Sequence, residues 1–149
     1  DMLCVGSVDP AQAIQDADIA VCAREFGCEV FMNTSFRGMN LSEYSGKTLG
    51  EVYPYVACAT VTRSSKFWKD CFQNLRQLHP KFHSWYGDQE AIRNVVNSGA
   101  YRVKFLKESA YGCLPDQPGQ ASLAPRLYHF KGARRKPMMI DYARNLGLM

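Results

Sequence analysis

Short apolar stretches, separated by polar and turn-rich segments, set the pattern of this chain. They predict buried strands at residues 2–5 and 19–23 and a further strand at residues 55–61; the alternating residues 101–106 and the short stretch 125–128 are also predicted to be strands. Apolar residues at three- and four-residue spacings, with capping residues or prolines at their starts, predict helices at residues 11–15, 66–78, 88–97 and from 137 onwards. Because strands alternate with helices, we expect parallel strands and an α/β fold in one domain, residues 1–149.

The longest predicted helix, residues 66–78, carries a set of apolar residues at helical spacing. We expect these side chains to form one buried face of the core rather than a ligand site. They are Phe67, Trp68, Cys71, Phe72, Leu75 and Leu78.

Residues 25–53 interrupt this pattern with many turn-prone residues and interleaved aromatic side chains. A long segment of this composition is typical of a lid or a substrate loop, where it would hold an acceptor. A plain surface insertion fits the composition equally well, and the sequence leaves both interpretations open.

The cysteines bear on the cellular compartment. None belongs to a Cys-x-x-Cys pair and most lie in apolar stretches, which predicts free, buried thiols in a reducing compartment rather than disulfides or a zinc site. No signal peptide and no apolar stretch of bilayer-spanning length is visible. We therefore expect a cytoplasmic location and no transmembrane segment. The six cysteines are Cys4, Cys22, Cys28, Cys58, Cys71 and Cys113.

Charge is distributed unevenly along the chain. Residues 1–60 carry eight acidic and three basic side chains, whereas residues 61–149 carry six acidic and fifteen basic ones. A basic C-terminal half favours an anionic partner, which would be a nucleotide, a nucleic acid or an anionic membrane surface. Aromatic residues do not interleave with the Arg/Lys run as stacking platforms would, so we expect no specific nucleic acid.

Residues 128–137 place several chemically active side chains between the last predicted strand and the last helix. His129 is a potential ligand for a divalent cation, and Gly132 lets the backbone approach a phosphate. Arg134, Arg135 and Lys136 would supply opposing positive charge. A solvated basic loop with a surface histidine is the alternative, since charge runs are usually solvated.

A carboxylate at the start of the chain is a possible partner for this histidine. Asp1 and His129 would offer oxygen and nitrogen ligands to one divalent ion, such as Mn²⁺. Their spacing alone says little, and a terminal aspartate is more often solvated.

Asp88 and Gln89, at the start of a predicted helix, form a further group of candidate site residues. Asp88 would cap backbone N–H groups there, or it would hydrogen-bond to sugar hydroxyls together with Gln89. The neighbouring Trp85 and Tyr86 would form an apolar face for a sugar ring, or they would be wall residues of the core.

Three segments, in this order, resemble a known family. Asp1-Met2-Leu3 resembles the end of an Asp-x-Asp-x-Leu strand, Asp88-Gln89-Glu90-Ala91-Ile92 resembles an Asp-Gln-x-x-Leu segment, and residues 129–137 resemble a His-x-x-Gly-x-x-Lys-Pro segment. These motifs are those of nucleotide-diphospho-sugar glycosyltransferases with the Rossmann-like, A-type fold. The nearest resemblance is to the glycogenin and lipopolysaccharide galactosyltransferase family.

The resemblance implies a role for each candidate residue. Asp1 and His129 would be ligands of Mn²⁺ or Mg²⁺, with a further aspartate two residues before Asp1. Asp88 and Gln89 would face the sugars as catalytic residues. The diphosphate would be met by Gly132, Arg134, Arg135 and Lys136, where one extra residue between glycine and lysine allows Arg135 to take the part of Lys136.

The implied function is metal-dependent transfer of a sugar from a nucleotide-diphospho-sugar donor to a hydroxyl acceptor, either a saccharide or a protein. In the family, strands before the Asp-x-Asp motif bind the nucleotide. We therefore expect a partial A-type fold that corresponds to the C-terminal part of the catalytic domain, and a missing N-terminal half of the enzyme as its partner.

One segment departs from the family pattern. The family usually has Asn-Ala/Ser-Gly on the strand before the long helix, whereas this chain has Val56-Ala57-Cys58 at that place. The departure keeps a second hypothesis open, namely a non-catalytic, decayed module that binds a sugar or a nucleotide.

Overall fold

The computed structural model describes residues 2–26, 35–36, 39–83, 85–116 and 125–149. Its main sheet contains β2 (Ile19–Ala23), β5 (Tyr55–Thr62) and β6 (Val103–Lys107), in the order β5-β2-β6. β6 lies parallel to β2, as expected, but β5 is antiparallel to it. The chain has a mixed α/β fold, and the prediction of parallel strands is wrong for β5.

The direction of β5 follows from where the chain returns to the sheet. Ala23, the last residue of β2, is the register partner of Tyr55, the first residue of β5. Just beyond this pair, the N–H of Arg24 donates to the carbonyl of Pro54 at 2.7 Å. The chain therefore leaves β2 and enters β5 at the same end of the sheet, and two neighbouring strands connected at one end run antiparallel.

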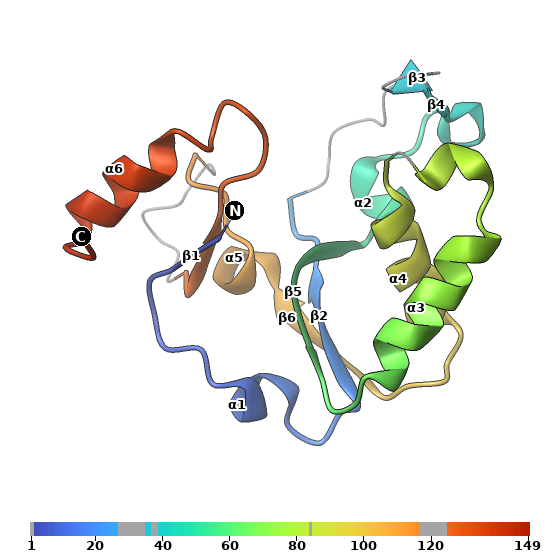
Figure 1. Cartoon of the computed structure of the whole chain (residues 1–149), viewed down its shortest axis with the longest axis horizontal. Coiled ribbons are helices and arrows are strands. Elements are labelled where there is room, and N and C mark those ends of the chain that lie inside the picture. The colour runs from blue at the N-terminus through green and yellow to red at the C-terminus, as the bar shows by residue number, and fades with distance from the viewer. Residues whose placement is uncertain (1, 27–34, 37–38, 84, 117–124) are drawn as a thin grey trace.

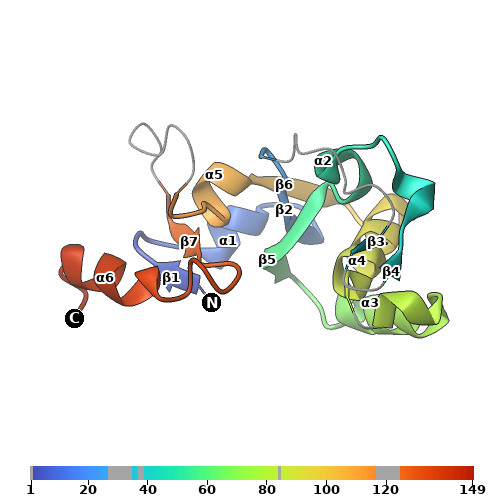
Figure 2. The same cartoon turned by 90° about the horizontal axis from the view of Figure 1, so that it is seen from above.

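Two helices, α3 (Lys66–Gln77) and α4 (Gly87–Asn97), cover one face of this sheet (Figures 1 and 2). Apolar side chains from β2, α3 and α4 form a common core there, and α1 (Pro10–Ile14) packs against the other face through Ala20 and Leu106. The residues of the larger core are Ile19, Val21, Phe67, Cys71, Ala91, Ile92, Val95 and Val96.

The predicted apolar face of α3 is only partly buried. Phe67 and Cys71, four residues apart, lie in the core, whereas Trp68 and Phe72 are 46% and 60% exposed. Each exposed residue follows a buried one in sequence, and a step of one residue rotates a side chain by about 100° around a helix. The apolar residues of α3 therefore cover more of the helix surface than the stripe that contacts the core. The prediction that all six are core residues is wrong.

A second, two-stranded sheet lies beside the first and carries the C-terminal helix (Figure 1). β1 (Met2–Cys4) pairs antiparallel with β7 (Leu127–His129), so the prediction of parallel strands is wrong here too, and Met2 lies opposite His129. The helix α6 (Met138–Asn145) packs on this sheet, where Tyr142 makes edge-on ring contacts with Tyr128 and Phe130. The sheet thus brings the start of the described chain next to the end of β7.

The second half of the segment 25–53 is packed rather than open. It contains β4 (Met39–Asn40), which pairs with β3 (Ser35–Phe36), then the 3₁₀ turn η1 (Ser42–Tyr44) and α2 (Leu49–Val52). Leu41, Val52 and Tyr53 form a buried cluster with Phe82 from the 3₁₀ turn η2 (Pro80–His83). Residues 27–34 and 37–38 lie outside the described residues, so a role for this segment as an acceptor loop stays a prediction.

A buried carboxylate joins the end of β2 to α5 (Glu108–Tyr111). Glu108 is 3% exposed and accepts hydrogen bonds from the N–H groups of Glu25 and Phe26, at 2.8 and 3.1 Å. In return, the carboxylate of Glu25 accepts from the N–H of Ser109 at 2.7 Å. These reciprocal bonds satisfy a buried charge and fix the exit of β2 against the first turn of α5.

Two of the sequence expectations concern the chain as a whole. The described cysteines, all except Cys28, are free thiols, and Cys22, Cys71 and Cys113 are buried as predicted, whereas Cys4 is exposed and Cys58 is only partly buried. Among the described residues, no helix combines the length and the apolar character that crossing a bilayer requires.

Candidate functional site

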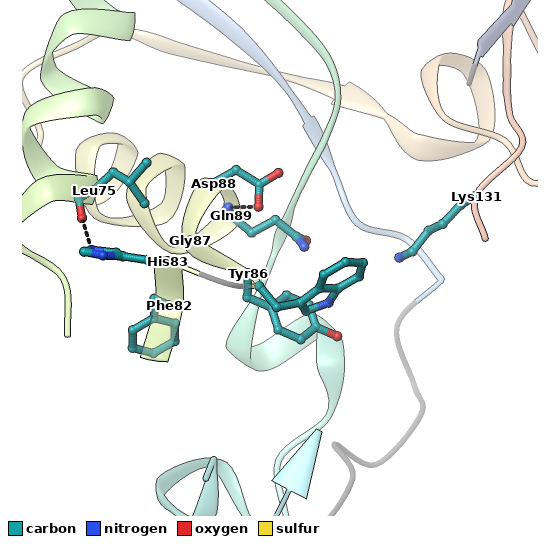
Figure 3. A pocket seen from close by; sticks show the side chains of 9 residues that line it. Leu75, Phe82, His83, Tyr86, Gly87, Asp88, Gln89 and Lys131 are labelled. Carbon is teal, nitrogen blue, oxygen red and sulfur yellow. Dashed lines mark hydrogen bonds between the residues drawn. The ribbon is translucent and has the colours of Figure 1, made fainter. Parts of the chain in front are cut away.

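A pocket of about 360 Å³ lies where the N-terminus of α4 faces the loop that follows β7 (Figure 3). Trp85, Tyr86, Asp88 and Gln89 line it from the start of α4, and Lys131 lines it from the loop. Figure 3 shows Gln89 and Lys131 extending towards one another from the two sides. The pocket therefore joins two segments that the sequence analysis selected separately.

Asp88 and Gln89 are both held by hydrogen bonds. α4 begins at Gly87 with Tyr86 at the N-cap position, so the prediction that Asp88 is the N-cap is wrong. Asp88 still accepts from a first-turn amide, the N–H of Gln89, at 2.8 Å. The side-chain carbonyl of Gln89 accepts from Arg24 at 3.0 Å, and the same guanidinium donates to the carbonyl of Tyr53 at 2.9 Å. Arg24, at the end of β2, thus fixes the direction of Gln89.

The backbone turns sharply where it enters α4. Tyr86 has a φ of 60°, a left-handed conformation that is strained for a bulky side chain. Its ring stacks on that of Tyr53 at 4.7 Å. A Cβ on the next residue, Gly87, would come within 2.4 Å of the carbonyl oxygen of Phe82, so only glycine fits there. This tight turn leaves Trp85 39% exposed at the pocket, whereas Tyr86 is a half-buried wall residue.

The loop after β7 is built around Gly132. This residue has a φ of 81°, and its carbonyl accepts from the N–H groups of Arg135 and Lys136 at 3.2 and 3.3 Å. A Cβ at Gly132 would meet no atom within 4 Å, so the backbone angle, rather than crowding, favours glycine there. The loop is exposed at Lys131, Gly132 and Lys136.

Two of the predicted diphosphate-binding cations contact a carboxylate. Asp116 binds Arg134 and Arg135 together, with 2.6 Å between its Oδ1 atom and the Nε atom of Arg135. The hydrogen bond from Arg135, followed by the charges of both guanidinium groups, lowers the pKa of Asp116 below its usual 3.8. Asp116 therefore anchors the loop. Because a guanidinium carries five N–H donors, this pairing does not exclude a further anion.

The lowered pKa of Asp116 predicts a pH-dependent contribution to stability. A carboxyl group whose pKa is lower in the folded state stabilises the fold above its unfolded pKa, and the effect is lost as the pH falls through the folded pKa. We expect Asp116→Asn to reduce the free energy of unfolding by less than about 1 kcal/mol near pH 7, because solvent screens exposed ion pairs. Urea unfolding of both proteins should show this difference narrowing as the pH falls below 3.8. A difference that is the same near pH 7 and near pH 2 would argue against an ionic anchor.

His129 lies at the end of β7, two residues before the pocket residue Lys131. The Cα register pairs it with Met2 of β1, and its backbone N–H donates to the carbonyl of Cys113 at 2.8 Å. Asp1, the predicted second ligand, lies outside the described residues. Among the residues that are described, no group of three or more His, Cys, Asp and Glu side chains is arranged to hold a metal ion. The predicted pair of Asp1 and His129 therefore stays untested.

The side chain of His129 takes part in a thiol cluster that the sequence analysis did not select. The interaction with Cys22, supported by a second one with His129, lowers the pKa of Cys58 despite burial. The interaction with Cys58, together with burial, raises the pKa of Cys22. Cys58 also lies 3.6 Å from the carbonyl of Tyr111. The segment that departs from the family pattern thus contacts the predicted metal ligand.

Other residues of the site were missed for different reasons. Lys131 is part of the basic stretch, but the diphosphate was predicted to bind the cations that follow it, Arg134, Arg135 and Lys136. Arg24, Asp116 and Cys22 reach the site only through contacts between residues far apart in the chain, and no local pattern marks them. Cys58 had one available signal, since it stands where the family usually has Asn-Ala/Ser-Gly.

The comparisons with known proteins add no assignment. No protein-family model, curated protein or solved structure matches the chain significantly.

Proposed function

We propose that this chain is the C-terminal part of a metal-dependent glycosyltransferase with a Rossmann-like, A-type fold. It would transfer a sugar from a nucleotide-diphospho-sugar to a hydroxyl acceptor. The observation that carries the proposal is the pairing of β1 with β7. It sets Met2, the residue after the predicted metal ligand Asp1, opposite the predicted ligand His129.

The pocket that Lys131 shares with the start of α4 supports the proposal through its chemistry. Asp88 offers acceptors and Gln89 offers donors to sugar hydroxyls, and the exposed face of Trp85 offers an apolar surface to a sugar ring. Lys131 contributes positive charge at the side of the pocket nearest the predicted diphosphate site. A mostly apolar pocket with a few converging polar groups is typical of a small-ligand site.

The donor types available for a metal fit Mn²⁺ or Mg²⁺. Asp1 would supply a carboxylate, which suits Mn²⁺ and Mg²⁺, and His129 would supply an imidazole, which suits a transition metal better than Mg²⁺. When bound, the ion would neutralise the charge that develops on the leaving diphosphate. The chain's own cations would add to this effect: Lys131 and Lys136 lie on the exposed surface of the Gly132 loop, and Asp116 holds Arg134 and Arg135 beside them.

Turnover of donor sugars tests this proposal. The protein as it is encoded, with whatever precedes Asp1, would be assayed for release of nucleoside diphosphate from a panel of nucleotide-diphospho-sugars with Mn²⁺. Asp88→Asn should lower kcat/KM by about 100-fold, because it removes a charged group that positions the sugar. Asp141→Asn is the matched control, since Asp141 is an exposed residue of α6 that pairs with Arg144. Equal losses in both variants would argue against a role for Asp88.

The same assay distinguishes glycosyl transfer from the alternative function. Val56-Ala57-Cys58 replaces the Asn-Ala/Ser-Gly segment of the family, and this observation favours a decayed, non-catalytic module that binds a sugar or a nucleotide. Donor binding without turnover of any sugar in the panel would support that alternative.

A further inference from the structure

Cys22 and Cys58 are neighbours because β5 bulges next to β2. The register changes from Val21 opposite Thr60 to Cys22 opposite Val56, so residues 57–59 lie between two successive partners of β2. A bulge of this kind redirects the side chains that it contains. Here it carries Cys58 at its middle, next to the buried Cys22 of the adjacent strand.

Because Gly112 has no side chain, the two sulfur atoms can occupy the space next to it. A Cβ on this residue would lie 2.6 Å from the Sγ atom of Cys58 and 3.4 Å from that of Cys22. Both sulfur atoms thus lie next to one point, and the two thiols are neighbours on adjacent strands. The backbone of Gly112 is extended, with a φ of −161°, so the contact with sulfur, and not the conformation, favours glycine there.

The two thiols differ in access to solvent. Cys22 is fully buried in the sheet, whereas Cys58 is half-buried. Cys58 is therefore the more exposed residue of the pair, and Cys22 is the thiol next to it. The other described cysteines lie elsewhere: Cys71 is in the α3 core, Cys4 is exposed on β1, and Cys113 packs against Tyr128 and Phe130.

We propose that Cys22 and Cys58 form a redox-active pair that a peroxide oxidises to an intramolecular disulfide. The sulfur of Cys58 attacks one peroxide oxygen and the O–O bond breaks. Water is released, and Cys58 becomes a sulfenic acid. The sulfur of Cys22 then attacks that sulfenic sulfur and displaces a second water. One peroxide molecule is reduced to two waters, the two thiols lose two electrons and two protons, and one S–S bond forms.

The disulfide has a local consequence at the end of β7. In the reduced protein, the thiol of Cys58 interacts with the side chain of His129. Oxidation commits the sulfur of Cys58 to Cys22, so the imidazole of His129 loses a thiol partner. This pairing stands on the thiol geometry alone and is independent of glycosyl transfer.

Peptide mapping after peroxide treatment tests the pair. The folded protein is treated with hydrogen peroxide, remaining thiols are alkylated in denaturant, and the tryptic peptides are identified by mass spectrometry. The expected result is the loss of two of the six thiols per chain and a linked peptide that joins residues 1–24 to residues 48–63. Thiol-specific reduction should reverse both changes.

Three variants assign the bond, because residues 1–24 contain Cys4 as well as Cys22. The linked peptide should persist in Cys4→Ser and disappear in Cys22→Ser and in Cys58→Ser. The map of the parent protein decides the matter even where a serine variant fails to fold. A bond from Cys58 to Cys4, Cys28 or Cys113, or overoxidation of Cys58 with Cys22 left as a thiol, would overturn the proposal.

Discussion

Phe67→Ala should lower the free energy of unfolding by about 3–5 kcal/mol, the usual cost of emptying a buried aromatic site. Phe67 is completely buried between α3, α4 and the sheet. Its ring makes edge-on contacts with Trp68 and Tyr101, at centroid distances of 5.1 and 5.6 Å. Alanine would remove these contacts and leave a cavity that the rigid sheet cannot close. Chemical unfolding followed by circular dichroism measures the change.

The matched control lies on the same helix. Phe72 belongs to the same apolar set in the sequence, but it is 60% exposed. Its ring contacts the guanidinium of Arg76 at 5.9 Å and adds no packing in the core. Phe72→Ala should therefore cost no more than about 0.5 kcal/mol. Similar losses in the two variants would show that the orientation of α3 is wrong.

Much of the secondary structure could be predicted because local patterns determine it. The apolar run at residues 19–23 is β2, and the periodic segment at 66–78 is α3 with an end one residue earlier. The helix that begins near Asp88 ends at Asn97, as expected. In each case, a run of one periodicity stands between clear turn residues, which is the situation in which local sequence is most informative.

The arrangement of the strands could not be predicted in the same way. A short apolar run fits a buried strand in a parallel sheet and in an antiparallel core alike, so it does not fix the direction of the strand. The direction of β5 depends on where residues 25–53 return to the sheet, and the separate pairing of β1 with β7 depends on residues more than a hundred positions apart. Both are properties of tertiary structure. The fold that the structure supports is α/β, while its assignment to the A-type glycosyltransferases is a proposal.

Short elements were also beyond the reach of the sequence analysis. α2 and α5 have four residues each, too few to show a helical period. A reciprocal capping box between Thr48 and Glu51 stabilises α2, and the buried Glu108 begins α5. Such elements depend on particular hydrogen bonds, and many turn-rich segments contain the same residue types without forming them.

For the candidate site, the sequence analysis identified segments more reliably than individual contacts. The start of α4 and the loop after β7 line one pocket, although forty residues separate Gln89 from the end of β7. Within the loop, however, the cation at the pocket is Lys131, whereas Arg134 and Arg135 contact Asp116. A motif fixes which segment carries a function, but the pairing of its charged side chains depends on neighbours from elsewhere in the chain.

Metal binding is the second large effect that we expect, and it depends on one side chain. His129 is the predicted metal ligand within the described residues, and β1 brings Met2 opposite it. Loss of even an outer-shell partner typically weakens metal binding by about 10- to 100-fold, so His129→Ala should weaken Mn²⁺ binding by at least that factor. His83→Ala is the control, because His83 is a second histidine near the site but its ring contacts the carbonyl of Leu75 at 3.0 Å and is not a predicted metal ligand.

Calorimetric titration of Mn²⁺, in the presence of a nucleotide-diphospho-sugar, tests the central claim most directly. It compares the parent protein as encoded with His129→Ala and His83→Ala. We predict saturable binding to the parent and to His83→Ala, and a loss of at least about 10-fold in affinity for His129→Ala. Equal Mn²⁺ affinity in the parent and in His129→Ala would contradict the proposed metal site, and with it the assignment to glycosyl transfer.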